Sequence, residues 1–366
     1  MRPVAGLLAR LAPPPPGDPF WRGFLLALLI ASAGGAVFAW LRLPLAWMLG
    51  AMFATTAAAV LRLPLRMPHA FRTVMTSVLG VLLGSAFSPG ILDQLGAWTL
   101  TIAFLLLYIL ASTFVVLLFL RLVARFDPVT AFFSAVPGGF QEMVTIGRAM
   151  GGDERVIALN HATRILMVVM LIPIWYRLFE GYVPPPDGIG GGGPAPNGLD
   201  LAILAGCGVF GALAGRALRL PAAMLLGPLA LSAAVHLAGL TQAKPPALVI
   251  GVAQVIIGAG IGVRFAGVTF RQLRRYVAIS FCTTALAIAI TVAFAIALKW
   301  LTGMPVLWVV LAYAPGGLAE MSLVALAIGA DAAFVASHHL VRISAIVMLI
   351  PLLFRLFRPL LTRISR

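Results

Sequence analysis

The sequence predicts an all-α integral membrane protein whose chain crosses the bilayer many times. Of its 366 residues, 61% are hydrophobic and only 10% are charged, and the mean hydropathy is +1.06. A soluble domain has about 25% charged residues, and a chain this apolar lacks the polar side chains to cover a water-facing surface. The long apolar runs also contain many of the 37 Gly and 26 Pro residues, as transmembrane helices do. An ordinary soluble enzyme is therefore excluded.

The net charge of +15 does not indicate nucleic-acid binding, because the basic residues are spread over the ends of apolar segments. The densest group is Arg271, Arg274 and Arg275. The positive-inside rule accounts for basic residues at such positions. Five His residues, of which only His338 and His339 are adjacent, do not form a recognisable oxygenase site. We therefore expect no catalysis, no metal, no cofactor and no direct contact with nucleic acid.

Twelve apolar segments approach the length of about 20 residues that a helix needs to cross hydrocarbon. Six precede a Gly- and Pro-rich linker and six follow it. The expected segments are 22–41, 44–61, 73–92, 95–123, 130–151 and 156–179, then 200–218, 221–240, 247–265, 276–301, 306–329 and 332–357. The chain then divides into five parts. In order, these are an N-terminal segment (1–21), the first membrane repeat (22–179), the linker (180–198), the second membrane repeat (199–357) and a basic tail (358–366).

The two halves repeat each other in sequence. The element LRLPLAWMLG at 41–50 recurs as LRLPAAMLLG at 218–227. Residues 137–179 align without a gap to residues 315–357, with 20 identities in 43 columns. Chance would give about one match in twenty, so the halves arose by duplication. Internal repeats of this kind are typical of transporter folds.

The basic residues favour one topology over another. Leaving out Arg164 and Arg342, which lie within apolar segments, 24 of the 26 basic residues mark the two sides. If all twelve segments span, with the N-terminus cytoplasmic, 15 fall inside and 9 outside. If the fifth segment of each half enters and leaves on the same side, each half crosses five times and the second half is inverted. Then 20 fall inside and 4 outside, with cytoplasmic termini and an extracytoplasmic linker.

Each fifth segment carries Pro-Gly-Gly near its middle, at 137–139 and 315–317. Pro removes a backbone hydrogen bond and Gly weakens a helix, so we expect a broken or re-entrant segment. The alternative is a proline kink in an ordinary spanning helix. Secondary transporters often build their site from interrupted helices near the midplane. The glycines are therefore candidate substrate-binding residues: Gly138, Gly139, Gly316 and Gly317.

Glu142 and Glu320 are the only acidic residues inside apolar segments, and they occupy equivalent places three residues after the second Gly. A charge at the bilayer centre costs on the order of 2.5–3.5 kcal/mol, which calls for a compensating role. One interpretation is a pair of carboxylates near a pseudo-two-fold axis that bind a cation or exchange a proton. The other, compatible with it, is that each Glu caps the N-terminus of the broken half-helix.

The next helix of each half carries His-x-x-Arg, as His161 with Arg164 and His339 with Arg342. A spacing of three places both side chains on one helical face. A buried Arg faces a partner or a water-filled cavity, here a Glu of the preceding segment or an anionic ligand. The alternative for each Arg is a structural Glu–Arg pair, and the alternative for each His is a hydrogen-bonded packing role.

Two further features concern polar residues near these motifs. Asp153 follows Gly151-Gly152, Asp331 follows Gly329-Ala330, and both are expected to cap the next helix. Some positions carry different residues in the two halves. A binding site on an approximate two-fold axis needs such differences to hold an asymmetric substrate. The secondary substrate-binding candidates on this ground are Gln141, Thr145, Asn160 and His338.

The duplicated PGGxxEM motif, with the LRLP elements upstream, resembles the AbrB family of membrane proteins over roughly residues 24–357. The resemblance implies a membrane protein linked to the regulation of gene expression, and some members are labelled as ammonia monooxygenases. The number and placement of the His residues do not support an oxygenase site.

Together these observations predict a secondary transporter of a small, anionic solute, coupled to H⁺ or Na⁺ through Glu142 and Glu320. The rival is a membrane-embedded regulator or sensor that binds a ligand without transport. We expect an inner (plasma) membrane location, a small-molecule or ion substrate and a possible homodimer.

Overall fold

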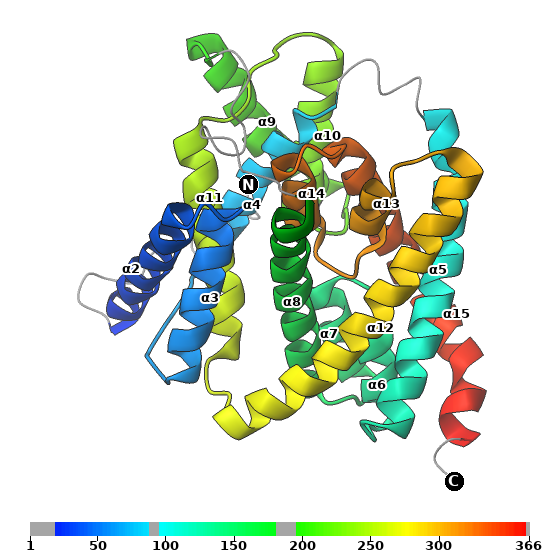
Figure 1. The fold of residues 1–366 in the computed structure, drawn as a ribbon. Coiled ribbons are helices and arrows are strands. Elements are labelled where there is room, and N and C mark those ends of the chain that lie inside the picture. The colour runs from blue at the N-terminus through cyan, green and yellow to red at the C-terminus, as the bar shows by residue number, and fades with distance from the viewer. Residues whose placement is uncertain (1–18, 88–94, 181–194, 364–366) are drawn as a thin grey trace. The chain divides into compact units, whose positions relative to one another are not determined.

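A computed structural model describes residues 19–87, 95–180 and 195–363, and within these ranges every regular element is helical (Figure 1). The chain forms two compact units. The first unit contains α2 (Pro19–Trp40), α3 (Ala46–Val60), α4 (His69–Gly84), α9 (Gly198–Ala217), α10 (Ala223–Leu237), α11 (Ala247–Gly262) and the 3₁₀ turn η2 (Val263–Phe265). The second contains α5 (Leu95–Leu122), α6 (Pro128–Ala135), α7 (Phe140–Ala149), α8 (Glu154–Glu180), α12 (Phe270–Thr302), α13 (Val306–Tyr313), α14 (Leu318–Ala327) and α15 (Ala332–Arg363).

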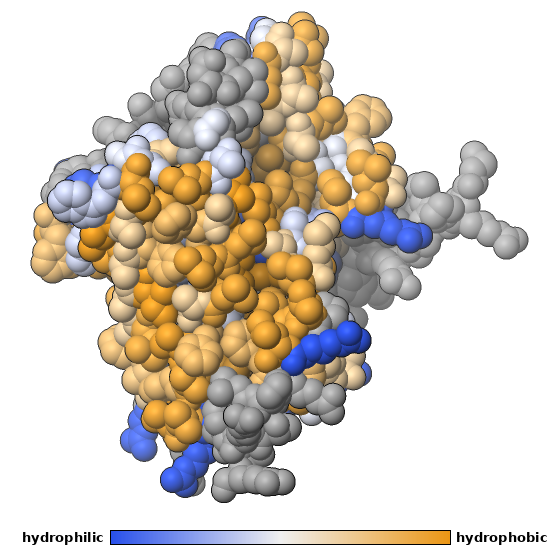
Figure 2. Space-filling view, turned by 90° about the vertical axis from the view of Figure 1, so that its right-hand side faces the viewer, coloured by the Kyte–Doolittle hydropathy of each residue, from blue (hydrophilic) through white to orange (hydrophobic). Residues whose placement is uncertain are grey.

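The prediction of an all-α chain rich in apolar helices is confirmed. Within the described residues, seven helices are long and apolar enough to cross a membrane: α2, α5, α8, α9, α11, α12 and α15. Of the residues in the apolar window of α2, only 28% are buried inside the protein, and in that of α12 only 33%. Figure 2 shows hydrophobic side chains over most of the visible face. Such a surface is expected where a helix faces lipid rather than water.

Most helices agree with the expected segments, but α3, α4 and α10 have 15, 16 and 15 residues and are not among the helices long enough to cross a membrane. The break expected at the two Pro-Gly-Gly motifs is present. There, each segment consists of two short helices of 8 and 10 residues, α6 with α7 and α13 with α14. The helix expected over 73–92 ends at Gly84, and the end of that range lies outside the described residues. The linker and both chain ends are likewise largely outside them.

Each compact unit takes helices from both sequence repeats. The first unit combines α2–α4 of the first repeat with α9–α11 of the second, and the second unit combines the remaining helices of both. The sequence repeats and the compact units therefore do not coincide. Each compact unit is formed by equivalent helices from the two repeats.

The two copies of the LRLP element adopt the same rare backbone. Arg42 and Leu45 have positive φ values of 53° and 52°, and the matching Arg219 and Ala222 have 52° and 47°. Left-handed φ is uncommon for residues other than Gly. Its recurrence at equivalent positions indicates that the two copies make the same sharp turn between a long helix and a 15-residue helix.

Small residues allow the helices of the first unit to approach closely. A Cβ on Gly34 of α2 would collide with the backbone of Gly50 in α3. The equivalent Gly211 of α9 meets Gly227 of α10 in the same way. Close crossings at Gly are typical of membrane helices, whose association depends on dispersion contacts instead of apolar burial from water.

Candidate functional site

The interruption of α6–α7 and of α13–α14 follows from the local sequence. Pro137 and Pro315 lack the N–H that would continue the preceding helix, and the residue before each Pro is extended, with ψ values of 127° and 139°. Gly139 and Gly317 act as extended N-caps of the second half-helices. The second half-helices end at Gly residues with positive φ, Gly151 (89°) and Gly329 (72°), as helix C-termini often do.

The Gly pair in each motif makes room for the Glu and Met that follow it. A Cβ on Gly139 would collide with the carboxylate of Glu142, and a Cβ on Gly138 would lie 2.8 Å from the sulfur of Met143. The second repeat has the same arrangement, with Gly317 against the Glu320 carboxylate and Gly316 against Met321. The spacing of PGGxxEM is thus a packing requirement of the break itself.

Glu142 and Glu320 lie in the first turns of α7 and α14 and are half-buried. A carboxylate in the first turn is favoured by the helix dipole, but among the described residues no backbone N–H donates to either carboxylate, so the expected capping hydrogen bonds are not formed. The expected Glu–Arg pair is not formed, because among the described residues neither Glu142 nor Glu320 makes an ion pair, whereas the exposed side chains of Arg148 and Glu154 do so at 3.2 Å. The buried arginines therefore take other partners.

Arg342 of α15 is almost completely buried and holds the end of α13. Its Nη1 donates to the carbonyl oxygens of Tyr313 (3.2 Å) and Ala314 (2.6 Å), and its Nη2 donates to that of Gly316 (2.8 Å). Nη2 also lies 2.9 Å from Nδ1 of His339. The carbonyls at a helix C-terminus carry partial negative charge. Arg342 thus supplies hydrogen bonds to the carbonyl groups that the second break leaves without helical partners. In return, the partial negative charge of these carbonyl groups stabilises its guanidinium.

Arg164 of α8 is equally buried but differs in its partners. Its Nη2 lies 2.9 Å from Nδ1 of His161, and no carbonyl oxygen among the described residues accepts from its guanidinium. Its Nε lacks a partner, as does the Nε of Arg342, so the difference between the two arginines lies at their terminal nitrogens. The first repeat thus leaves a buried cation without the compensation that its counterpart has in the second.

The two histidines have a structural role, as the packing interpretation predicted. The Nε2 of His161 donates to the carbonyl oxygen of Phe133 in α6 (2.8 Å), and that of His339 donates to Leu311 in α13 (2.9 Å). Each Nδ1 then accepts from the neighbouring Arg, so each ring is neutral. Both rings fix the long helix to the first half-helix of their repeat.

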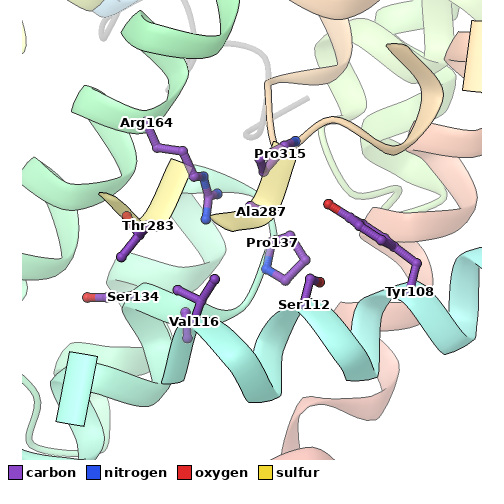
Figure 3. Close-up of a pocket in the computed structure, with 10 residues that line it drawn as sticks. Tyr108, Ser112, Val116, Ser134, Pro137, Arg164, Thr283, Ala287 and Pro315 are labelled. Atoms are coloured by element: carbon purple, nitrogen blue, oxygen red, sulfur yellow. The ribbon is translucent and has the colours of Figure 1, made fainter. Parts of the chain in front are cut away.

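A small cavity lies beside Arg164, within the second unit (Figure 3). Both break prolines, Pro137 and Pro315, line it, and Arg164 and Tyr108 approach them from opposite sides in this view. Its accessible volume of about 10 Å³ corresponds to roughly one water molecule. The remaining lining residues come from α5, α6 and α12: Ser112, Val116, Ser134, Ala135, Thr283 and Ala287.

Polar contacts join the two repeats around this cavity. Asn160 donates to the carbonyl oxygen of Ser134 (3.2 Å) and accepts from the hydroxyl of Ser280 in α12 (3.0 Å). Its counterpart His338 bonds to Thr101 of α5 at 2.8 Å. In both cases α8 or α15 of one repeat is linked to the long helix of the other. These two sequence candidates therefore position helices around the cavity.

The cavity contains one of the sequence candidates and several residues that were not singled out. Arg164 lines it, whereas Gln141 and Thr145 are exposed and do not line it. Sequence reasoning missed Tyr108, Ser112 and Thr283. The available signal was the presence of polar side chains within two of the most apolar segments, since such residues in a membrane segment mark a functional interior.

The predicted helix caps are confirmed. Asp153 accepts from the backbone N–H of Arg155 (2.9 Å) and Val156 (3.1 Å). Asp331 accepts from Ala333 and Phe334, both at 2.9 Å. Both fix the starts of the long helices that carry the His-x-x-Arg motifs.

The chain is similar to known proteins over nearly its whole length. Residues 47–358 match the family described as "Transition state regulatory protein AbrB". YhjN of Bacillus subtilis (strain 168) is 26% identical over 367 residues, with 91% of this chain and 92% of YhjN covered. A protein of Escherichia coli (strain K12) that bears the name "Putative regulator AbrB" is 26% identical over 348 residues, with 92% of this chain and 95% of that protein covered. Both Pro-Gly-Gly breaks lie within the range matched to the family.

Proposed function

The chain belongs to the AbrB family, and we propose that it is a secondary transporter of a small anionic solute, coupled to H⁺ or Na⁺. The observation that carries this proposal is that the prolines of two interrupted helices line a single cavity beside a buried arginine. Interrupted backbone inside a membrane is tolerated where protein or water satisfies it. Discontinuous helices that meet in the protein interior are a common way to build a transport site.

The proposed topology has two inverted repeats with five crossings each, an extracytoplasmic linker and both termini in the cytoplasm of the inner membrane. Each Pro-Gly-Gly segment enters and leaves on one side. The distribution of Lys and Arg supports this arrangement, with 20 on the cytoplasmic side and 4 outside.

Helix directions in the first unit also support the inversion. α4 runs parallel to α10, and α11 runs parallel to α3, as follows from the order of contacts along each pair. These contacts join Gly80 to Leu225, Gly84 to Leu229, Gly258 to Met48 and Gly262 to Met52. The start of α4 lies beside the end of α11, where the side chain of Arg72 lies against Gly260. The inverted arrangement requires these two helices to run in opposite directions, so that α10 runs opposite to α3, its counterpart in the first repeat.

Glu142 and Glu320 are the proposed sites for the coupling ion. They are half-buried carboxylates in the breaks, and neither forms an ion pair within the described chain. A carboxylate in such a position can bind Na⁺ or exchange a proton during transport. The solute leaves unchanged, so the proposal contains no catalytic step. The substrate-binding set includes Arg164 together with the glycines and prolines of the breaks.

Uptake into proteoliposomes tests the proposal. The purified full chain is reconstituted and supplied with labelled small carboxylates under an imposed proton or sodium gradient. We expect gradient-driven uptake by the parent and its loss in Glu142→Gln and Glu320→Gln. Glu154→Gln is the matched control, because Glu154 forms an exposed ion pair outside the breaks. Unchanged coupled uptake in both break variants contradicts the role of these carboxylates.

A second candidate function is regulation without transport, which the name of the Escherichia coli relative favours. A sensor binds its ligand but gives no flux, and it contacts a cytoplasmic partner through its basic loops. Ligand binding by the purified chain in the absence of uptake for every gradient would favour this alternative.

A further inference from the structure

We infer that Arg164 and Arg342, although equivalent in sequence, have separate roles: Arg164 binds a single monovalent anionic group in the cavity, and Arg342 is a structural residue of the second break. This inference deepens the proposed function, because it assigns the anion to one residue and limits its charge. It rests on the contacts of the two guanidiniums.

Arg342 has no capacity left for a ligand at its terminal nitrogens. Nη1 and Nη2 together donate to three carbonyl oxygens and to Nδ1 of His339. The carbonyl groups of Tyr313 and Ala314 belong to the negative end of α13. They supply the charge compensation that a buried guanidinium requires.

Arg164 has the opposite surroundings. It is 5% exposed and bonds to one neutral ring, that of His161. The charge of Arg342 also repels that of Arg164 across the interior. A buried cation with one neutral partner is costly. A monovalent anion beside Arg164 would balance its charge.

The cavity supplies hydroxyl groups that suit an anion. Ser134 is fully buried, and its Oγ has no hydrogen-bond partner. The side chains of Ser112, Thr283 and Tyr108 also line the space. Hydroxyl and guanidinium donors together solvate an anion in the absence of water. Figure 3 shows Arg164 directed toward this space from α8.

The cavity size and the charge limit the ligand class. An accessible volume of about 10 Å³ holds roughly one water-sized group, which is the scale of a small halide ion or of one carboxylate oxygen of a solute. A tetrahedral divalent oxyanion such as sulfate is larger than this space. The shared chemistry is thus a singly charged anion.

Differences between the repeats support the division of roles. Ser134 of the first repeat corresponds to Ala312 of the second, so the unpaired hydroxyl of Ser134 has no counterpart at the equivalent position beside Arg342. Ala135 corresponds to Tyr313, whose own carbonyl group binds Arg342. The residues around each Arg thus differ in the way that one binding role and one structural role require.

Anion-dependent thermal stability of the purified full chain provides the test. Unfolding midpoints are measured in detergent in sodium acetate, sodium chloride and sodium sulfate at equal ionic strength. We expect a saturable rise of the midpoint with acetate, chloride or both, relative to sulfate. A response to acetate alone identifies a carboxylate site, and a response to chloride alone identifies a halide site. The absence of a response to either anion overturns the inference.

The same Arg-to-Gln substitution in each repeat distinguishes the binding role of Arg164 from the structural role of Arg342. Arg164→Gln is expected to abolish the anion response without lowering the midpoint in sulfate. Arg342→Gln is expected to lower the midpoint in every salt and to retain the anion response. Arg164→Lys keeps the charge without the planar donor geometry, and we expect its apparent affinity to fall about tenfold. A response that persists in Arg164→Gln, or one lost in a folded Arg342→Gln, contradicts the inference.

The thermal-stability experiment measures anion binding and does not depend on whether the protein transports a solute. Anion binding through Arg164 without uptake into proteoliposomes would refute the proposed transport and leave this inference intact. Uptake that survives Arg164→Gln would refute the inference and leave transport intact.

Discussion

The carboxylate of Glu142 occupies the space beside Gly139 that the Cβ of any other residue would need, and Glu320 occupies the same space beside Gly317. The acidic residue and the glycine of each motif are therefore coupled by packing. This relationship explains the fixed spacing of three within each PGGxxEM sequence. It also means that a substitution at either position changes the surroundings of the other.

Substitution of Gly139 by Ala should reduce stability by about 1 kcal/mol or less, because the Glu142 carboxylate is the end of a flexible side chain and can change rotamer to avoid the new Cβ. The loss should shrink when Glu142→Ala is added, since the double variant removes the colliding group. A double-mutant cycle on thermal unfolding in detergent measures this coupling. Strict additivity of the two single effects would contradict the packing argument. Gly151→Ala, in open space but at positive φ, is a control for backbone strain alone.

Arg342→Lys should destabilise the protein by about 3 kcal/mol or more. A lysine presents one ammonium group and cannot reach all three carbonyl oxygens of the second break. Thermal unfolding of the purified variant, compared with Arg164→Lys, measures the effect. An equal loss in both variants would contradict the difference between the two environments.

Asn160→Ala should cost about 1–2 kcal/mol, because it removes one bond to Ser134 and one from Ser280. Ser280→Ala should cost less, since it removes only one of these bonds. The pair should be coupled in a double-mutant cycle. Independent effects would mean that the link between α8 and α12 does not contribute to stability.

Leu at Gly34 and Leu at Gly211 should reduce stability to a similar extent, about 3 kcal/mol each. Both side chains would meet the backbone of the partner helix at equivalent crossings of the two repeats. Gly251→Leu is the control, because a Cβ there meets open space. A much smaller effect at one of the two crossings would contradict their equivalence.

Cysteine labelling in intact cells should place the linker outside and both termini inside. We expect a membrane-impermeant reagent to modify a cysteine at position 191, which lies outside the described residues, but not one near Met1 or Arg366. The native Cys207 and Cys282 are first replaced by Ser or Ala. Labelling of position 191 from the same side as the termini would refute the inverted arrangement.

The sequence determined the helices, because each rests on local chemistry. Apolar runs of membrane length predicted the long helices, and the Pro-Gly-Gly motif predicted the break between α6 and α7 and between α13 and α14. Asp153 and Asp331 were identified as caps for the same reason, since a cap depends on residues two or three positions away. The duplication is also a property of the sequence alone.

Only the tertiary structure decided which helices pack together and which polar groups meet. Arg164 and Arg342 share one motif, and no local rule separates the residue held by three carbonyl groups from the residue that faces a cavity. That difference depends on the path of the backbone after α13 and on Ser134, Tyr108 and Thr283, which come from three other helices. Hydrogen bonds between residues more than 20 positions apart have no periodic signature in the sequence, so they are fixed only when the chain folds.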